Sequence, residues 1–149
     1  MSHRREIRRL AMQLLYQIDL RGEADLPAIA QSLADGPDPA EFYEPALALA
    51  RAAWSDRTKA DALASELAPT WPTLRQPPVD RALLRLAYHE MASGYSPVKV
   101  AINEAVELAK RYCGEQSPAF LNGVLDKMAK RLAASAATPM TNDELPNDE

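Results

Sequence analysis

Residues 97–110 read PVKVAINEAVELAK, and the spacing of their apolar residues predicts an α-helix. The apolar side chains stand three and four positions apart, at Ile102, Ala105, Val106 and Ala109. That spacing places them on one face of a helix with about 3.6 residues per turn. Pro97 precedes the run and Gly114 follows it, which supplies a start and a stop signal.

The same spacing recurs on both sides of this stretch and predicts about seven helices in all. We expect helices over residues 4–20 and 25–34, two over 41–67 that meet near Asp56, and three that begin near Asp80, after Pro97 and at Ser117. Apolar residues make up 47% of the chain but aromatic residues only 6%. Such a core suits close-packed helices better than a sheet, so the predicted fold class is all-α.

Four prolines crowd the connection at residues 69–78, which predicts a structured link rather than a helix. We therefore expect one domain over residues 1–133, made of two helical bundles at about 1–68 and 78–133. Residues 134–149 have no helical period and carry only acidic charge, and they are predicted to form a disordered tail.

The distribution of charge and the single cysteine indicate the kind of ligand and the cellular compartment to expect. The formal net charge is −4, but five arginines lie in residues 1–21 while the tail holds four acidic residues and no basic one, so the charge is segregated. Cys113 has no partner for an internal disulfide, which favours a reducing compartment. Neither an apolar signal segment nor a membrane span is apparent, and the cytoplasm is the expected location.

We find no pattern typical of a catalytic, metal or nucleotide site. His89 lacks a second histidine one turn on, and a contact in space between Cys113 and a histidine stays open. Glu104 and Glu107 are spaced as paired carboxylates, but Lys110 and Arg111 follow one turn on and favour a solvated, ion-paired face, with Glu107 paired to Arg111. The expectation is a protein without catalytic residues, metal or cofactor.

The first predicted helix carries a basic stripe on the side opposite its apolar face. The stripe consists of Arg5, Arg9, Met12 and Tyr16, with Arg4 and Arg8 alongside. Guanidinium groups bind phosphates and stack on bases, as a phenol ring does, so the stripe favours single-stranded RNA as a ligand. The plainer interpretation is a solvated helix face, because basic helix faces are common.

Several stretches of this sequence resemble proteins of the NusB family. They are residues 97–110, the run FLNGVLDK at 120–127, the run VDRALLRLA at 79–87, and the opening helix with its arginines followed by AMQLLY at 11–16. The resemblance covers nearly the whole chain outside the acidic tail, although residues 22–77 match by helix pattern alone.

The resemblance implies a fold of two packed helical bundles and a role in transcription antitermination. It further implies binding to boxA RNA in the leaders of ribosomal RNA operons, together with ribosomal protein S10, within an RNA polymerase antitermination complex. The arginine-rich start maps onto Arg4, Arg5 and Arg8, followed by Tyr16. The resemblance further implies that Phe120, at the family's aromatic position near the start of the last helix, contacts RNA. It implies that Asp80 and Gln116 lie near the RNA or S10 surface, as residues that bind the partner.

Two other functions remain open at this point. A helical adaptor that binds only protein would use the same arginines on an acidic partner. A relative of the RNA-recognition domain of ribosomal RNA cytosine methyltransferases would need a cofactor-binding domain, and none follows within the sequence that ends at Glu149. The sequence does not decide between a monomer and a homodimer.

Overall fold

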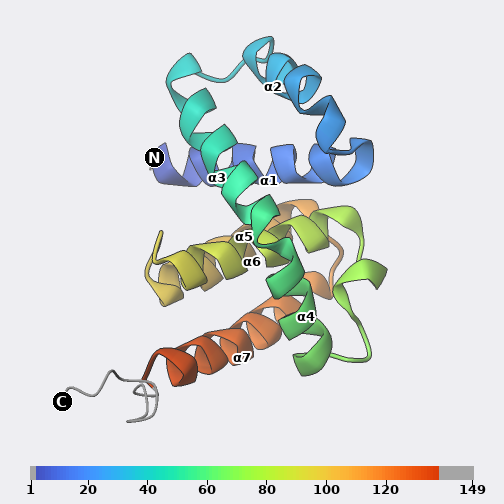
Figure 1. Cartoon of the computed structure of the whole chain (residues 1–149), viewed down its shortest axis with the longest axis vertical. Coiled ribbons are helices and arrows are strands. Elements are labelled where there is room, and N and C mark those ends of the chain that lie inside the picture. Colours follow the sequence, from blue (N-terminus) through green and yellow to red (C-terminus); the bar gives the residue numbers. More distant parts are fainter. Residues whose placement is uncertain (1–2, 138–149) are drawn as a thin grey trace, which may run out of the picture.

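The computed structural model describes residues 3–137, which form seven α-helices and no strand (Figure 1). The helices are α1 (His3–Arg21), α2 (Leu26–Ala34), α3 (Tyr43–Ser55), α4 (Arg57–Leu67), α5 (Pro78–Ser93), α6 (Val98–Tyr112) and α7 (Ser117–Ala137). Short 3-10 turns at Glu23–Asp25, Ala40–Phe42 and Thr73–Arg75 lie in the connections. The all-α prediction is confirmed, and α3 and α4 meet at Asp56 as expected.

Glycines and prolines set several helix ends. Gly22 and Gly94 follow α1 and α5 with φ of 95° and 76°, a left-handed backbone that residues with a side chain rarely adopt. Pro27 and Pro78 lie in the first turns of α2 and α5, where a backbone N–H has no helical partner to lose. Because Pro78 is accepted there, α5 begins two residues before the expected start at Asp80.

The last helix is longer than the sequence predicted. α7 continues through residues 134–137, which were expected to belong to the disordered tail. Residues 133–137 are four alanines and one serine, and the high helix propensity of alanine extends the helix without an apolar stripe. The rest of the predicted tail, residues 138–149, lies outside the described part of the chain.

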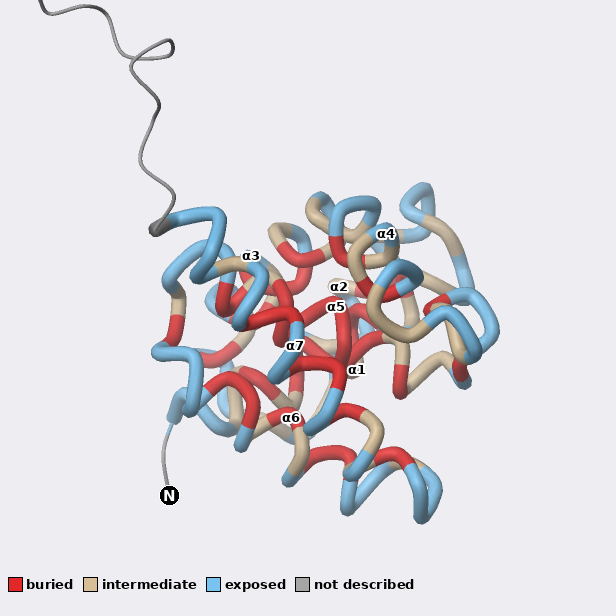
Figure 2. Tube along the Cα trace, turned by 90° about the horizontal axis from the view of Figure 1, so that it is seen from below, coloured by how far each residue is buried: buried red, intermediate tan, exposed pale blue. Residues whose placement is uncertain are grey.

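Helix α5 occupies the centre of the molecule and packs against α1, α3, α4, α6 and α7. α1 and α7 lie on opposite sides of the α5–α6 pair (Figure 1). Burial is accordingly highest where the helices meet, and much of the outer surface of the helices and turns is exposed (Figure 2). Since α1 and α3 contact α5 directly, the buried residues form one cluster, and the division into two bundles stays a prediction.

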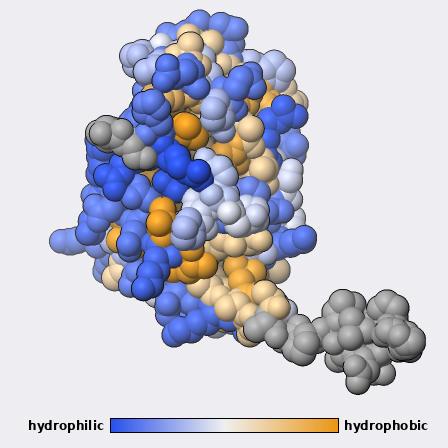
Figure 3. Space-filling view, turned by 90° about the vertical axis from the view of Figure 1, so that its left-hand side faces the viewer, coloured by the Kyte–Doolittle hydropathy of each residue, from blue (hydrophilic) through white to orange (hydrophobic). Residues whose placement is uncertain are grey.

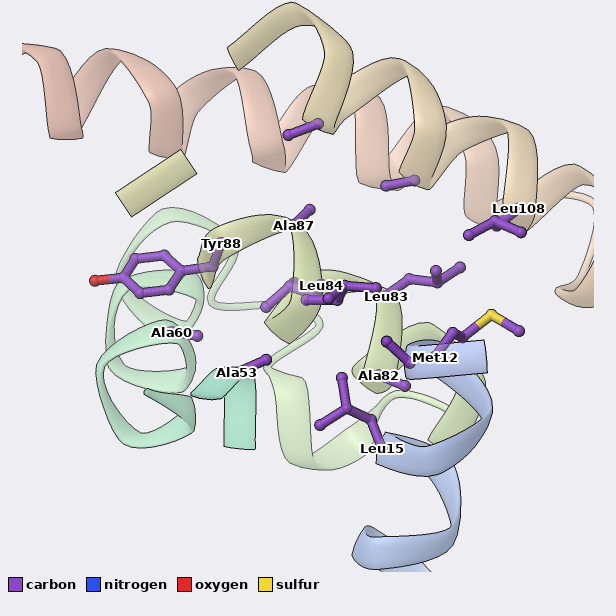
Figure 4. Packing of buried hydrophobic residues seen from close by; sticks show 14 of the residues in the cluster. Met12, Leu15, Ala53, Ala60, Ala82, Leu83, Leu84, Ala87, Tyr88 and Leu108 are labelled. Carbon is purple, nitrogen blue, oxygen red and sulfur yellow. The ribbon is translucent and has the colours of Figure 1, made fainter. Parts of the chain in front are cut away.

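The core is built from leucine and alanine side chains, with each fully buried leucine contributing about 1.5–3 kcal/mol. Met12 belongs to this core and is only 3% exposed, so its expected place on the solvent side of α1 is wrong. Figure 4 shows it extending from α1 toward Leu108 of α6. The physical reason is that Met12 packs into the buried cluster to which α5 and α6 also contribute. Among the described helices, none is both long and apolar enough to cross a membrane.

Candidate nucleic-acid interface

Arg5 is exposed to solvent at the start of α1, as the sequence predicted for the arginines of this helix. Its side chain is 53% exposed and forms two hydrogen bonds to Glu104 of α6, from Nε at 2.8 Å and from Nη2 at 2.7 Å. These hydrogen bonds raise the pKa of Arg5 and lower the pKa of Glu104. An exposed pair of this kind is screened by solvent and salt, so a phosphate can compete with Glu104 for the guanidinium.

Arg4 lies beside Arg5 at the edge of a larger hollow. It donates from Nη2 to the backbone oxygen of Tyr95 at 2.6 Å, and its guanidinium lies 4.4 Å from the centre of the Tyr95 ring. Among the described residues it has no carboxylate partner. The hollow has a volume of about 360 Å³ and is lined by Arg4, Arg5, Arg8, Tyr95, Ser96, Pro97, Val100 and Glu104.

The structure contradicts the prediction that Arg8 faces solvent. The side chain is 4% exposed and donates from Nε to Glu90 at 2.8 Å and from Nη2 to Ser96 at 2.7 Å. Ser96 in turn donates its hydroxyl to Glu90 at 2.6 Å. We call Arg8, Glu90 and Ser96 the inner clasp. It joins α1 to the end of α5 and to the α5–α6 turn, and it leaves Arg8 no free surface for RNA.

Arg9 is also less available than the sequence suggested. Its side chain is 18% exposed, and Nη2 donates to Glu6 at 3.0 Å and to Asp38 at 2.6 Å. The pairing holds the segment before α3 against α1. Three of the four arginines, Arg5, Arg8 and Arg9, are thus paired with carboxylates, and Arg4 is the exception among the described residues.

A groove of about 130 Å³ separates α1 from α6. It is lined by Arg5, Glu6, Arg9, Glu104, Glu107, Leu108 and Arg111, and we call it the α1–α6 groove. The expected ion pair between Glu107 and Arg111 is wrong, because Glu107 pairs with Lys110 at 3.0 Å instead. The Arg111 guanidinium lies 5.4 Å from the centre of the Tyr112 ring.

The two aromatic residues expected to contact RNA lie on different helices. Tyr16 of α1 is 36% exposed. Phe120 of α7 is half-buried and packs edge to face on Trp71, with ring centres 4.5 Å apart. Trp71 lies in the proline-rich connection and did not stand out in the sequence. Both aromatic positions therefore present ring surface, but Phe120 shares its surface with Trp71.

The two residues expected to contact a protein partner differ in exposure. Gln116 is exposed in the α6–α7 turn. Asp80 is 1% exposed and accepts a hydrogen bond from Ser117. Burial raises the pKa of the nearby Cys113 thiol to about 12, with a further contribution from Asp80. Asp80 therefore ties α5 to the turn that carries Gln116, and its position does not suit direct contact with a partner.

Most of the surface beside the start of α1 is hydrophilic, with smaller apolar patches (Figure 3). Within residues 3–137 no group of three or more His, Cys, Asp or Glu side chains is placed to hold a metal ion. What this region offers chemically is hydrogen-bond donors with positive charge, next to aromatic rings, which suits binding of phosphates and bases.

Comparison with known proteins identifies the family. The family model for NusB matches residues 5–130. The chain belongs to the NusB family. Among its relatives, the transcription antitermination protein NusB of Chloroflexus aggregans is 37% identical over 136 residues, which cover 89% of this chain and 91% of the relative. NusB of an Anaeromyxobacter species is 41% identical over 130 residues, 87% of this chain and 91% of the relative.

Solved structures of NusB share the fold. T. maritima NusB superposes with a TM-score of 0.75 at 34% identity, over 87% of this chain and 92% of the other. A chain from the crystal structure of antitermination factors NusB and NusE in complex with dsRNA superposes with a TM-score of 0.72 at 27% identity, over 88% of this chain and 98% of the other. The NusB-like fold predicted from the sequence is confirmed, and the chain is a transcription antitermination factor of this family.

Proposed function

We propose that this protein binds boxA RNA of ribosomal RNA operon leaders together with ribosomal protein S10. The observation that supports this most is the likeness to the NusB chain seen with dsRNA and NusE, which is ribosomal protein S10, and this likeness extends over 88% of the present chain. The proposed complex acts on RNA polymerase during transcription of those operons, which places the protein in the cytoplasm.

In this proposal Arg4 and Arg5 bind RNA phosphates at the start of α1. Both are exposed, and neither is held by a buried carboxylate. Tyr16 and Phe120 offer ring surface for bases. Gln116, exposed in the α6–α7 turn, is the proposed contact to S10 or to RNA next to S10.

The remaining predicted site residues act indirectly in this proposal. Arg8 holds the α5–α6 turn through the inner clasp, and that turn carries Tyr95, on which Arg4 is stacked. Arg9 anchors the segment around Asp38. Asp80 positions the α6–α7 turn through Ser117.

A gel-shift titration tests the proposal directly. Labelled boxA leader RNA is titrated with the full chain, with and without S10, beside an RNA of the same composition in scrambled order. We expect boxA RNA to bind more tightly than the scrambled RNA and S10 to strengthen the difference. Equal affinity for both RNAs, with S10 present, would contradict the proposal.

The adaptor alternative and the oligomeric state are examined with the same material. Binding of S10 in the absence of any RNA affinity would favour a protein-binding adaptor. Sedimentation of the protein alone, across the concentrations of the titration, measures whether it is a monomer or a homodimer.

A further inference from the structure

The far end of the α1–α6 groove carries an exposed arginine, Arg111, whose charge is not paired with a carboxylate of the described residues. Arg111 is exposed, and among residues 3–137 it has no carboxylate within ion-pairing distance. In the opening helix, by contrast, Arg5, Arg8 and Arg9 are each paired with at least one carboxylate, and among residues 3–137 only Arg4 shares the unpaired state of Arg111 within this surface. A cation without a carboxylate partner does not have to give up an ion pair when it binds a phosphate.

The geometry of the two helices brings Arg111 to the stripe of α1. Arg5 pairs with Glu104, while Arg9 lines the same groove as Leu108 and Arg111. The residue numbers rise together along this groove, so α1 and α6 run in the same direction. Arg111 therefore extends the basic surface of α1 onto α6.

Each of the two helices carries an exposed tyrosine one turn beyond a residue of the buried cluster. Tyr16 lies one helical turn after Met12 on α1, and Tyr112 lies one turn after Leu108 on α6. Met12 and Leu108 point toward each other (Figure 4). Tyr16 is 36% exposed and Tyr112 is 38% exposed, so both rings present apolar surface to solvent.

We propose that Arg111 and Tyr112, together with Tyr16, form a further contact for single-stranded RNA at this end of the groove. Arg111 binds a phosphate, and the Tyr112 ring stacks on a neighbouring base. This inference rests on the proposed RNA-binding function and adds α6 to the surface that the opening helix provides.

The test compares two arginines in the full-length protein. Affinity for labelled boxA leader RNA is measured across a salt series for the wild type, Arg111→Gln and the matched control Arg51→Gln. Arg51 is an exposed arginine of α3 and likewise has no carboxylate partner among the described residues. Arg111→Gln is expected to lower the slope of log affinity against log salt by about 0.7, with no change for Arg51→Gln.

A second pair of variants tests whether the Tyr112 ring stacks on a base. Tyr112→Ala is expected to weaken RNA binding by about 5- to 150-fold with little change in salt slope, while Tyr112→Phe keeps most of the affinity. S10 binding is measured separately and is expected to stay unchanged in all variants. Helical circular dichroism confirms that each variant is folded before it is titrated.

The outcomes separate this inference from the proposed function. If the wild type binds boxA RNA and Arg111→Gln retains its affinity and slope, the contact on α6 is overturned and the proposed function stands. If Arg111→Gln loses S10 binding while RNA binding holds, the surface is a protein interface and the inference is again overturned. If the wild type binds no RNA with or without S10, both fail.

Discussion

The inner clasp and the α1–α6 groove use the same residue type, three positions apart on one helix, for different purposes. Arg8 is 4% exposed and its partner Glu90 only 2%. Arg5 is 53% exposed and its partner Glu104 is 14% exposed. A charge buried with its partner is costly to uncover, whereas a solvent-exposed pair is weak and exchanges readily. Burial, and not residue type, thus decides which arginine stabilises the fold and which is available to a ligand.

Replacing Arg8 is the strongest way to test this contrast. Arg8→Ala leaves the Glu90 carboxylate buried without its counter-charge, and we expect the free energy of unfolding to fall by about 3–5 kcal/mol. Urea denaturation followed by circular dichroism measures it. The double variant Arg8→Met with Glu90→Leu removes both charges and should recover most of the loss. An Arg8→Ala variant as stable as the wild type would mean that the clasp adds nothing to folding.

Arg9 should lie between the two extremes. Its side chain is 18% exposed and bridges Glu6 and Asp38. We expect Arg9→Ala to lower the free energy of unfolding by about 1 kcal/mol, because partial exposure weakens each ion pair. The same denaturation measurement applies, with Asp38→Asn as a check that the loss comes from this bridge. A loss as large as that of Arg8→Ala would remove the correlation with burial.

Arg5 provides the functional side of the comparison. We expect Arg5→Ala to leave the urea midpoint unchanged, while the slope of log RNA affinity against log salt falls by about 0.7. Titration of boxA RNA at several salt concentrations measures the slope. A shifted midpoint together with an unchanged slope would assign Arg5 to the fold instead.

The smallest expected effect is the pH dependence of the Arg5–Glu104 pair. The hydrogen bond from Arg5 lowers the pKa of Glu104 in the folded protein. The pair therefore adds stability above the unfolded glutamate pKa of about 4.3, and this contribution is lost as the pH falls through the lower folded value.

Glu104→Gln measures this contribution. The stability difference between wild type and Glu104→Gln should be constant above about pH 5 and shrink toward zero in more acidic solution. Glu107→Gln is the matched control, because Glu107 pairs with Lys110, whose side chain is 59% exposed. A difference that grows as the pH falls would have the wrong sign for this pair.

Helix positions were predictable from the sequence because apolar spacing, prolines and glycines act locally. The seven helices follow from such signals. The extension of α7 to Ala137 was missed because its last residues have propensity but no apolar stripe.

The partners of the arginines were not predictable in the same way. Arg8 meets Glu90 across 82 positions of sequence, and nothing local distinguishes it from Arg5. Of the predicted stripe, Arg5 and Arg9 line the α1–α6 groove and Met12 extends toward Leu108 of α6, so this side of α1 lies beside another helix. Amphipathic spacing identifies faces and does not say which second helix covers them.

The inner clasp also has a consequence for the time course of synthesis. Arg8 is among the first residues to leave the ribosome, but Glu90 follows it by 82 positions and Ser96 by 88. At about 5–20 residues per second, Arg8 waits roughly 4–18 s before its two clasp partners exist. During that interval the Arg8 guanidinium lacks both of its buried partners, in a setting rich in ribosomal RNA. The order of residues along the chain therefore means that the start of α1 is fixed by the inner clasp only after α5 and the α5–α6 turn have been synthesised.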